Sequence, residues 1–557
     1  MSLSAIPAPS VRERIRRLLA FALLCAGPVA LALWALPRTI EAPLPAVAGP
    51  SLACVSYAPF RRPGHAPFEA DLVIPPAAIE ADLALIARVS RCVRTYGVGH
   101  GQDALPALAA KLGLRVRLGV WISADPVANA RELAIGLRLA RAHRDVVDLL
   151  IVGNEVLLRR DLTPAQLTAL LKEARRGAAV PIAYADVWEF WLRHAKVLRG
   201  HVDVAAIHIL PYWEDHPVGI DAATQHVRAI AAQARAALAP LPLWIGETGW
   251  PAAGRQRGAA APGVVEQARF VRELVAAPPP EAPDFNLIEA FDQPWKRALE
   301  GAVGGAWGIF DAGGRQRVAF TGSVPGDATA RAVGIALAVG ALGGAVAVAA
   351  FARRRSNAAR LAMLLAGALI AGLAPLQWRI LIEECRVPGH WALGALLCAL
   401  AVGAALDCAL RLLAVLDPRD AKGGEFTPAW REWFMPAWLF AAACYALMLI
   451  FDGRYRPLAW PLLIAPALLA LALALLGQPA HARRFTRAMR VLGAGSAVGA
   501  VAVVAIEGVA NGAALSVALG LACAGVAVEI AHRRGAGQAP VRSSAAIQNA
   551  GAAGPAP

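Results

Sequence analysis

The chain has 557 residues, of which 57% are hydrophobic and 17% charged, and its mean hydropathy is +0.50. A composition this apolar excludes a purely soluble protein and predicts membrane segments. The formal net charge of +15 would suit a nucleic-acid-binding protein, but the basic runs stand beside apolar segments, where Lys and Arg orient membrane helices. We therefore expect a membrane, and no nucleic acid, among the partners of this chain.

The first predicted element is a membrane anchor. Residues 1–17 are basic, and the apolar segment 18–36 that follows is about long enough to cross a bilayer. A cleaved signal peptide is the alternative, but no small-residue cleavage site stands directly after the segment. We expect an uncleaved anchor with a cytoplasmic N-terminus, which sends the next domain across the membrane.

Residues 45–325 have a soluble composition and a repeated alternation of strand and helix. Strands are expected at 52–60, 91–97, 115–122, 147–155, 181–187, 202–212, 241–248 and 286–293. Helical periodicity lies between most of them, as at 76–89, 126–143, 164–176 and 222–238. Eight such units predict an α/β fold, a (β/α)8 TIM barrel. A doubly wound open sheet is less favoured, because its glycine-rich phosphate turn is replaced by YAPFRRPG after the first strand.

Residues 328–531 form the third zone, which predicts an all-α region of seven transmembrane spans. The apolar stretches run at 332–352, 361–378, 391–413, 434–451, 458–476, 491–506 and 512–530. Their basic flanks all fall on one side: Arg353, Arg354, Arg355, Arg360, Arg411, Arg419, Lys422, Arg431, Arg483, Arg484, Arg487, Arg490, Arg533 and Arg534. With the anchor this makes eight spans, with both termini in the cytoplasm and the barrel on the opposite side of the membrane. Residues 532–557 are predicted to be a disordered cytoplasmic tail.

The eight cysteines include no CxxC pair, so neither a zinc site nor a redox pair is indicated. Cys54 and Cys92 fall in neighbouring predicted strands. If Tyr57 and Tyr96 both face the barrel interior, alternation along the strands places the two thiols on opposite faces. We therefore expect these cysteines to be unpaired.

Two predicted strands close with a glutamate. The fourth ends in IVGNE and the seventh in WIGETGW, so Glu155 and Glu247 stand at the strand ends where TIM barrels carry their active sites. A single glutamate in such a place is usually a solvated loop charge, but both of these close apolar runs that otherwise exclude charge. Two carboxyl groups about 5–5.5 Å apart are what a retaining glycosidase needs. Asn154 is placed to bind the sugar 2-hydroxyl, and this mechanism requires no metal or other cofactor.

Other polar and aromatic residues near the predicted strand ends leave two interpretations open. Trp188, Trp191, Trp213, Trp250, Trp295 and Trp307 are suited either to stacking on pyranose rings or to core packing. His208 has the parity to face the barrel, although a core histidine is the favoured interpretation. Glu189 and Glu214 are either binding groups or solvated charges. In the apolar zone, Asp407 and Arg411 are interpreted as an intrahelical pair.

Many segments in order resemble glycoside hydrolase family 17. They are CVSYAPFR, RTYGV, VGNEVLLRR, YADVWEFW, HILPYWEDHP, IGETGWP, NLIEAFDQPWKR and GGAWGIFD, and they lie within residues 50–325. The likeness is to the bacterial membrane-bound branch that is linked to β-glucan synthesis. It implies that Glu155 is the acid/base and Glu247 the nucleophile.

The resemblance also implies substrate-binding residues. Tyr212 would hydrogen-bond near the nucleophile, and Tyr57, Arg94 and Tyr96 would line the floor of the subsites. The remaining predicted sugar contacts are Asn154, Trp213, Trp250, Glu289, Gln293, Trp295, Lys296 and Trp307. Plant members of the family carry a glutamate where Gln293 stands.

These observations together predict a retaining β-1,3-glucan-active enzyme. The resemblance favours a glucanosyltransferase of bacterial β-(1,3)/(1,6)-glucan synthesis or remodelling, working through a covalent glycosyl-enzyme. A simple β-1,3-glucan hydrolase would carry the same residues and remains open. A glucan-binding or glucan-exporting protein without catalysis is less favoured because both glutamates are intact, and a nucleotide-sugar synthase because DxD and QxxRW motifs are lacking.

Overall fold

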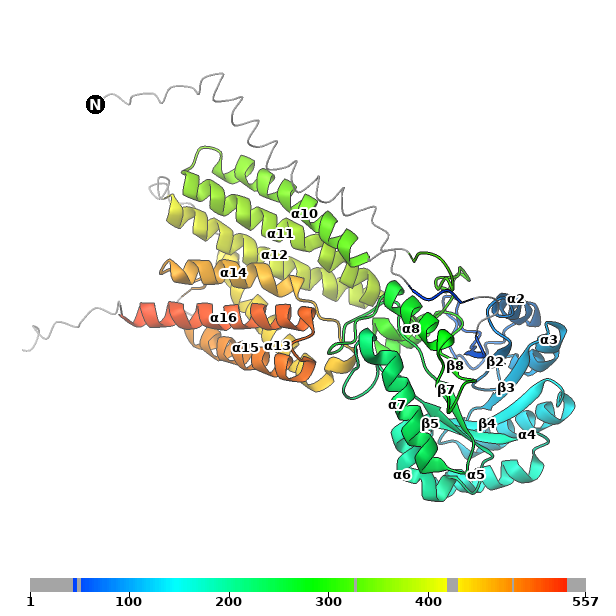
Figure 1. The fold of residues 1–557 in the computed structure, drawn as a ribbon. Helices are drawn as coiled ribbons and strands as arrows, with labels where there is room; N and C mark the ends of the chain where they lie inside the picture. The colour runs from blue at the N-terminus through cyan, green and yellow to red at the C-terminus, as the bar shows by residue number, and fades with distance from the viewer. Residues whose placement is uncertain (1–43, 48–51, 325–327, 418–428, 483–484, 538–557) are drawn as a thin grey trace, which may run out of the picture.

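The computed structural model describes residues 44–47, 52–324, 328–417, 429–482 and 485–537. An α/β barrel comes first along the chain, and an all-helical region packs beside it (Figure 1). The predicted anchor at 18–36 and most of the predicted tail lie outside the described residues.

Eight parallel strands form the sheet, and each lies within a predicted strand. They are β1 (Cys54–Ser56), β2 (Cys92–Arg94), β3 (Arg115–Val120), β4 (Val147–Asn154), β5 (Ile182–Val187), β6 (Val204–His208), β7 (Leu243–Glu247) and β8 (Asn286–Leu287). Their order is β7-β6-β5-β4-β3-β2-β1-β8. A bridge between Thr248 and Leu287 brings the two edges together. The sheet is thus a nearly closed barrel, as predicted.

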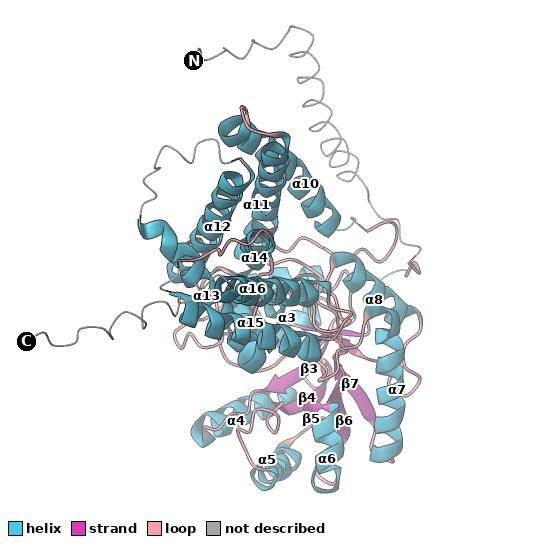
Figure 2. Ribbon diagram, turned by 90° about the vertical axis from the view of Figure 1, so that its left-hand side faces the viewer, coloured by secondary structure: helices cyan, strands magenta, loops and turns pink. Residues whose placement is uncertain are grey.

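Helices cover the outside of the barrel (Figure 2). They are α2 (Pro76–Ile86), α3 (Leu105–Lys111), α4 (Pro126–Ala142), α5 (Pro164–Gly177), α6 (Trp188–Leu198), α7 (Ile220–Leu238) and α8 (Val264–Ala276). Three of them begin with a proline, whose fixed φ suits the first helical position. Asp125 caps α4, and Thr163 with Gln166 forms a capping box on α5. These local signals explain why the helix starts were predictable.

The prediction that Cys54 and Cys92 are unpaired is wrong. The two cysteines form a disulfide between β1 and β2, with Cα atoms 4.4 Å apart. Strand β1 ends at Ser56, so alternation does not extend to Tyr57. Cys54 therefore shares the face of Ser56, which is paired in register with Arg94. Both thiols lie on the same face because neighbouring strands in register present the same side.

The helical region consists of α10 (Ala328–Ala347), α11 (Asn357–Glu384), α12 (Pro388–Leu416), α13 (Phe434–Asp452), α14 (Pro461–Leu475), α15 (Thr486–Glu507) and α16 (Gly512–Gly537). Six helical segments in the described part of the chain are long and apolar enough to cross a membrane. The exception is α14, whose 15 residues rise about 22 Å, short of a hydrocarbon core of about 30 Å. The expectation of seven spans here is thus corrected to six.

Small residues allow the first two of these helices to pack closely. A Cβ atom added to Gly343 on α10 would lie 2.2 Å from the Cβ of Ala371 on α11. Glycine at this position lets the backbones approach, as is common between membrane helices. Deeper in the region, Asp407 pairs with Arg411 as predicted and also with Arg431.

The loop after β7 fastens the barrel to the helical region. Arg255 forms an ion pair with Glu507 at the end of α15, and its guanidinium donates to the carbonyl oxygen of Arg456 at 3.0 Å. Asn511, just before α16, donates to the carbonyl oxygen of Gln256 at 3.0 Å. The carboxyl end of β7 therefore faces the connections between the apolar helices.

Candidate active site

The backbone turns sharply where β4 ends. Gly153 and Glu155 both adopt positive φ angles, 87° and 53°. Such an angle is uncommon for a residue other than glycine and is often found at functional sites. The Glu155 amide donates to the carbonyl oxygen of Ala185 at 2.8 Å, which fixes the turn. The Glu155 side chain is thereby directed into the barrel mouth, where 23% of it is exposed.

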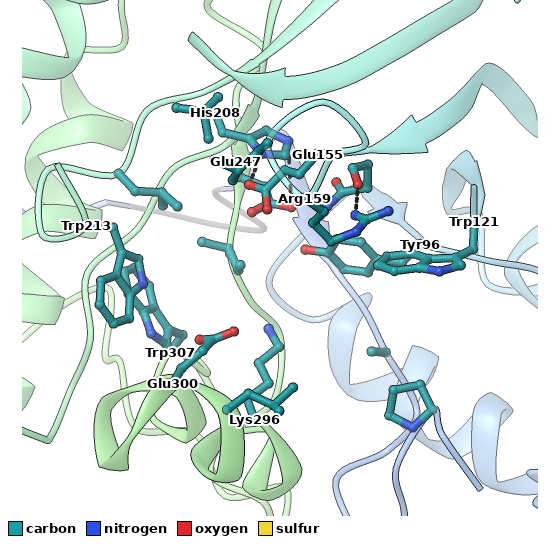
Figure 3. Close-up of a pocket in the computed structure, with 18 of the residues that line it drawn as sticks. Tyr96, Trp121, Glu155, Arg159, His208, Trp213, Glu247, Lys296, Glu300 and Trp307 are labelled. Carbon is teal, nitrogen blue, oxygen red and sulfur yellow. Dashed lines mark hydrogen bonds and ion pairs between the residues drawn. The ribbon is translucent and has the colours of Figure 1, made fainter. Parts of the chain in front are cut away.

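Glu247, the last residue of β7, lies opposite Glu155. One carboxylate oxygen of Glu155, one of Glu247 and a ring nitrogen of His208 all lie within 4.8 Å of one another. The two glutamates face each other in the cleft (Figure 3). The separation is on the scale of retaining glycosidases and well below the roughly 6.5–9.5 Å of inverting ones.

His208, the last residue of β6, lies between the two glutamates. Its Nδ1 atom is 2.8 Å from Glu155 Oε1, and its Nε2 atom is 3.7 Å from Glu247 Oε1. Burial lowers the pKa of His208, but the carboxylates of Glu247 and Glu155 outweigh it and raise this pKa above the usual value. The favoured interpretation as a core histidine therefore missed a member of the site. Two features of the sequence could have predicted this role of His208: its position near the end of a predicted strand, and the alternation that directs its side chain into the barrel.

Arg94 at the end of β2 holds the other side of the pair. The buried guanidinium donates to Glu247 Oε1 and to Asn154 Oδ1. Burial raises the pKa of Glu247, but the charges of His208 and Arg94 outweigh burial and lower it to about 2. Glu247 is therefore a carboxylate at any physiological pH.

A cleft of about 690 Å³ surrounds these groups, within the range of ligand pockets. Tyr96 and Trp121 lie on one side of the glutamates, and Trp213 and Trp307 on the other (Figure 3). The rings of Trp213 and Trp307 are stacked, with centroids 6.4 Å apart. Asn154 and Trp295 also line the cleft. Flat aromatic faces and few polar anchors suit a sugar chain.

Lys296 brings a charged cluster to one wall. Its Nζ donates to Glu289 Oε2 at 2.9 Å, and it lines the cleft together with Glu300. Burial raises the pKa of both Glu289 and Glu300 to about 7, against the lowering effect of Lys296. Glu300 was not among the predicted site residues, because it follows β8 within a short helix, α9 (Arg297–Glu300), that has no strand-end signal.

Two tyrosines that were predicted to contact the substrate lie outside the cleft lining. Tyr57 follows the end of β1, so its hydroxyl points outward and donates to Asp82 on α2 at 3.0 Å. Tyr212 lies beyond the end of β6, and its hydroxyl donates to the carbonyl oxygen of Arg255 at 2.7 Å. Neither residue is among those that line the cleft. In both cases the prediction assumed that the alternation of side chains continues beyond the residue at which the strand ends.

Three further predicted contacts lie behind the cleft wall. Trp250 donates to the carbonyl oxygen of Ala261 at 3.1 Å and packs against Phe270. Gln293 is buried, and its Oε1 accepts from Trp295 Nε1 at 2.8 Å. Glu289 contacts the cleft only through Lys296. Gln293 therefore positions an aromatic wall residue in place of a direct sugar contact.

The other residues whose interpretation was open are now placed. Trp191 is a core residue beside Tyr184. Trp188 donates to Glu214 at 3.2 Å, and Glu189 and Glu214 line the cleft.

The Glu155, His208 and Glu247 atoms also have the spacing of a metal-binding group. The donor set is a poor fit for a cation, however, because the guanidinium of Arg94 already neutralises Glu247 and His208 is engaged by Glu155. A metal would have to displace or tolerate a buried positive charge.

Comparison with known proteins shows what this barrel is similar to. Residues 54–308, slightly less than half of the chain, match the BtgE/BtgC glycoside hydrolase domain. The barrel is therefore similar to domains of glycoside hydrolase family 17. This similarity supports an O-glycosyl hydrolase or transglycosylase.

Relatives of the barrel cover only its share of the chain. A glucan 1,3-beta-glucosidase of Candida albicans is 25% identical over an alignment of 258 residues, gaps included, that covers 42% of this chain and 83% of the relative. One of Arthroderma benhamiae is 29% identical over an alignment of 254 residues that covers 42% of this chain and 82% of the relative. The crystal structure of a family 17 beta-1,3-glucanosyltransferase from Rhizomucor miehei is 25% identical, covers 48% of this chain and 97% of its own, and has a TM-score of 0.42.

Proposed function

We propose that this chain is a retaining β-1,3-glucan-active enzyme in which Glu247 is the nucleophile and Glu155 the acid/base. The observation that carries the proposal is the close approach of the two carboxylates, within 4.8 Å, because an inverting enzyme needs room for a water molecule between them. The relatives named as glucan 1,3-beta-glucosidases support a β-1,3-glucan as the substrate.

The two glutamates divide the chemistry by their surroundings. Glu247 is kept ionised by Arg94 and His208, so its oxygen can attack the anomeric carbon. As the glycosidic C–O bond breaks, Glu155 gives its proton to the departing oxygen, which leaves a glucosyl ester on Glu247. In the second step an acceptor hydroxyl attacks the anomeric carbon, Glu155 takes the proton, and the ester bond breaks.

The acceptor decides whether the outcome is hydrolysis or transfer. We favour transfer to a second glucan, as in bacterial β-(1,3)/(1,6)-glucan synthesis or remodelling. Two features support this: the likeness of CVSYAPFR and HILPYWEDHP to the membrane-bound bacterial branch, and six apolar helices that would hold the barrel where an envelope glucan is assembled. Simple hydrolysis is the second candidate, since water can use the same two glutamates.

The test is a product analysis with the full chain in detergent. Purified wild-type protein is incubated with laminari-oligosaccharides of one length, and the products are separated by size and analysed for linkage. Products longer than the substrate are expected. In Glu247→Gln both long and short products should fall by at least about a thousandfold, because a neutral amide cannot attack the anomeric carbon. Glu80→Gln, at an exposed position on α2, is the matched control and should retain full activity.

Each outcome has a definite meaning. Shorter sugars alone, at every substrate concentration, would show a hydrolase and exclude transfer. Full activity in Glu247→Gln would refute the assignment of the nucleophile.

The location proposed is a bacterial inner membrane with the barrel on the periplasmic side and the termini in the cytoplasm. Basic helix ends lie away from the barrel: Arg534, for example, donates to the carbonyl oxygen of Leu475 at the end of α14. The barrel contacts the opposite ends, at Glu507 and Arg456. The positive-inside rule then places the barrel outside the cytoplasm.

Thiol alkylation checks this location. In the periplasm Cys54 and Cys92 would be joined and should resist alkylation in rapidly quenched cells until a reductant is added. If both thiols react without reductant, the barrel lies in a reducing compartment and the proposed orientation is wrong.

A further inference from the structure

Part of the cleft wall comes from the helical region. Arg454 and Tyr455 line the same cleft as Glu155 and Glu247. They belong to a short 3-10 turn, η7 (Gly453–Tyr455), in the connection between α13 and α14. The other lining residues lie between Ala58 and Trp307, within the barrel. The cleft is therefore built from two parts of the chain, the barrel up to Trp307 and the turn that begins about 150 residues later.

Tyr455 extends an aromatic wall that begins in the barrel. Its ring meets the ring of Trp213 edge-on, with centroids 5.7 Å apart. Trp213 in turn is stacked with Trp307 at 6.4 Å. Tyr455 is 41% exposed, so its ring remains available to a ligand. Trp307 is buried and backs Trp213, so the rings of Trp213 and Tyr455 are the two aromatic surfaces here on which pyranose units can stack.

Arg454 adds polar groups at the same place. Its guanidinium donates to the carbonyl oxygen of Trp213 at 2.6 Å and pairs with Asp215 at 3.5 Å. Its side chain is 41% exposed. A guanidinium carries five N–H donors, more than these two contacts use. Donors that point into the cleft can bind sugar hydroxyls.

The turn is held firmly against the barrel. Arg255 donates to the carbonyl oxygens of Gly453 and Arg456, on either side of the two lining residues. The carbonyl oxygen of Tyr455 lies so close to Gly301 that an added Cβ would be 2.5 Å from it. Such contacts preorganise the turn, and preorganisation reduces the entropy lost when a ligand binds.

We propose that Arg454 and Tyr455 form a glucan-binding subsite that the helical region contributes to the barrel. The subsite rests on the proposed function, and it lies at the end of the cleft that holds Trp213 and Trp307. A short oligosaccharide bound at Glu155 and Glu247 does not reach it. A longer chain stacks on Tyr455, and its hydroxyl oxygens accept hydrogen bonds from the guanidinium of Arg454. The helical region thus sets chain-length preference as well as location.

The test uses the full chain in detergent and a series of laminari-oligosaccharides of increasing length. Tyr455→Leu and Arg454→Gln are chosen because they keep an apolar and a polar side chain, respectively, at these partly exposed positions while removing the ring and the guanidinium group. For long substrates kcat/KM should fall about three- to tenfold, the range expected for the loss of one aromatic or polar contact. For the shortest substrate that is cleaved it should not change. Tyr455→Phe, which keeps the ring, should restore the length dependence of the wild type.

Arg456→Ala is the matched control. Arg456 stands directly beyond the turn, its exposed side chain pairs with Asp452, and it does not line the cleft. Its removal should leave the length dependence of kcat/KM unchanged.

Three results would overturn the subsite. The first is an unaltered length dependence in both variants. The second is an equal loss at every length, which would show that the turn merely supports Trp213. The third is a loss in Tyr455→Phe as large as in Tyr455→Leu. A wild-type chain that cleaves no laminari-oligosaccharide would instead refute the proposed function, and the subsite with it.

Discussion

Arg94 determines the charge of the candidate site. It is completely buried and donates both to Glu247 and to the amide oxygen of Asn154. A guanidinium does not lose its proton in proteins, so this positive charge persists at every pH at which the protein is folded. Because the amide oxygen of Asn154 is occupied, we expect its NH2 group to face the sugar.

His208 gives a prediction for the pH dependence. In acid solution His208 is protonated and helps to keep the pKa of Glu247 near 2. His208→Asn removes that charge, while the burial of Glu247 continues to raise its pKa. The Glu247 carboxylate should then become protonated at a higher pH than in the wild type. The acid limb of the kcat/KM profile should move to higher pH by about one unit or more.

The measurement is kcat/KM against pH for the wild type and the variant. His201→Asn is the control, since His201 precedes β6 at the opposite end of the barrel. An acid limb that stays in place in His208→Asn would mean that His208 does not act on Glu247.

At this scale the sequence was informative about the two glutamates and misleading about the two tyrosines. Glu247 ends β7 and Glu155 directly follows β4, and the structure brings them together as expected. Beyond the end of a strand, alternation no longer determines direction: the turn with positive φ angles directs Glu155 into the cleft, whereas Tyr57 and Tyr212 lie outside the cleft lining. Glu300 is positioned by a loop and a short helix, so no periodic pattern could mark it.

The barrel closes through short strands. Strand β8 has only two residues and β1 only three, and β8 meets the other edge strand, β7, through the bridge between Thr248 and Leu287. The Cys54–Cys92 disulfide binds β1 covalently to β2. With a sequence separation of 38 residues, the loss of chain entropy in the unfolded state is equivalent to about 4 kcal/mol.

Removal of this bond should destabilise the barrel. Cys54→Ser is expected to lower the free energy of unfolding by about 2–4 kcal/mol, measured as a lower melting temperature of the purified chain. Cys385→Ser, which changes a free cysteine, is the control. A reductant should lower the melting temperature of the wild type and leave that of Cys54→Ser unchanged; equal effects on both would contradict a stabilising role.

The positions of strands and helices were predictable because local signals and pattern agreed. Pro76, Pro126 and Pro164 mark helix starts, and apolar runs mark the strands. Two element-level expectations were wrong for physical reasons. The disulfide depends on where β1 ends, which is settled by pairing with two neighbours. The length of α14 depends on where its helix begins and ends, which mean hydropathy does not reveal.

On the scale of the whole molecule, the largely buried ion pair between Arg255 and Glu507 helps to couple the barrel to the helical region. The Arg255 and Glu507 side chains are 6% and 12% exposed. Loss of one partner leaves an uncompensated, largely buried charge, which costs about 3–5 kcal/mol. In Glu507→Gln we expect faster hydrogen exchange in residues 453–456, with unchanged protection of the barrel strands.

The comparison is made by hydrogen exchange of the full chain in detergent. Arg533→Ala, which breaks an exposed pair with Glu529 at the far end of α16, should leave exchange at 453–456 unaltered. Unchanged exchange in Glu507→Gln would show that the barrel is held by other contacts.

The contribution of Arg454 and Tyr455 to the cleft could not be predicted from the sequence. Both residues lie in a short connection between apolar helices, where polar groups are ordinarily solvated. Their role depends on how two separately patterned parts of the chain pack together, through contacts such as that between Arg454 and Trp213. Periodicity describes each part alone and carries no information on that packing.

The contacts at Arg255, Gln256 and Arg454 also fix the position of the barrel relative to the helical region. An enzyme joined to its anchor by a flexible linker can reach any polymer within the length of that linker. A barrel mounted at several loops keeps its cleft at one fixed height above the helices. A membrane-held enzyme of this kind would process only glucan at that height. The distance from the membrane at which it acts would therefore be determined by the contacts between the barrel and the helices.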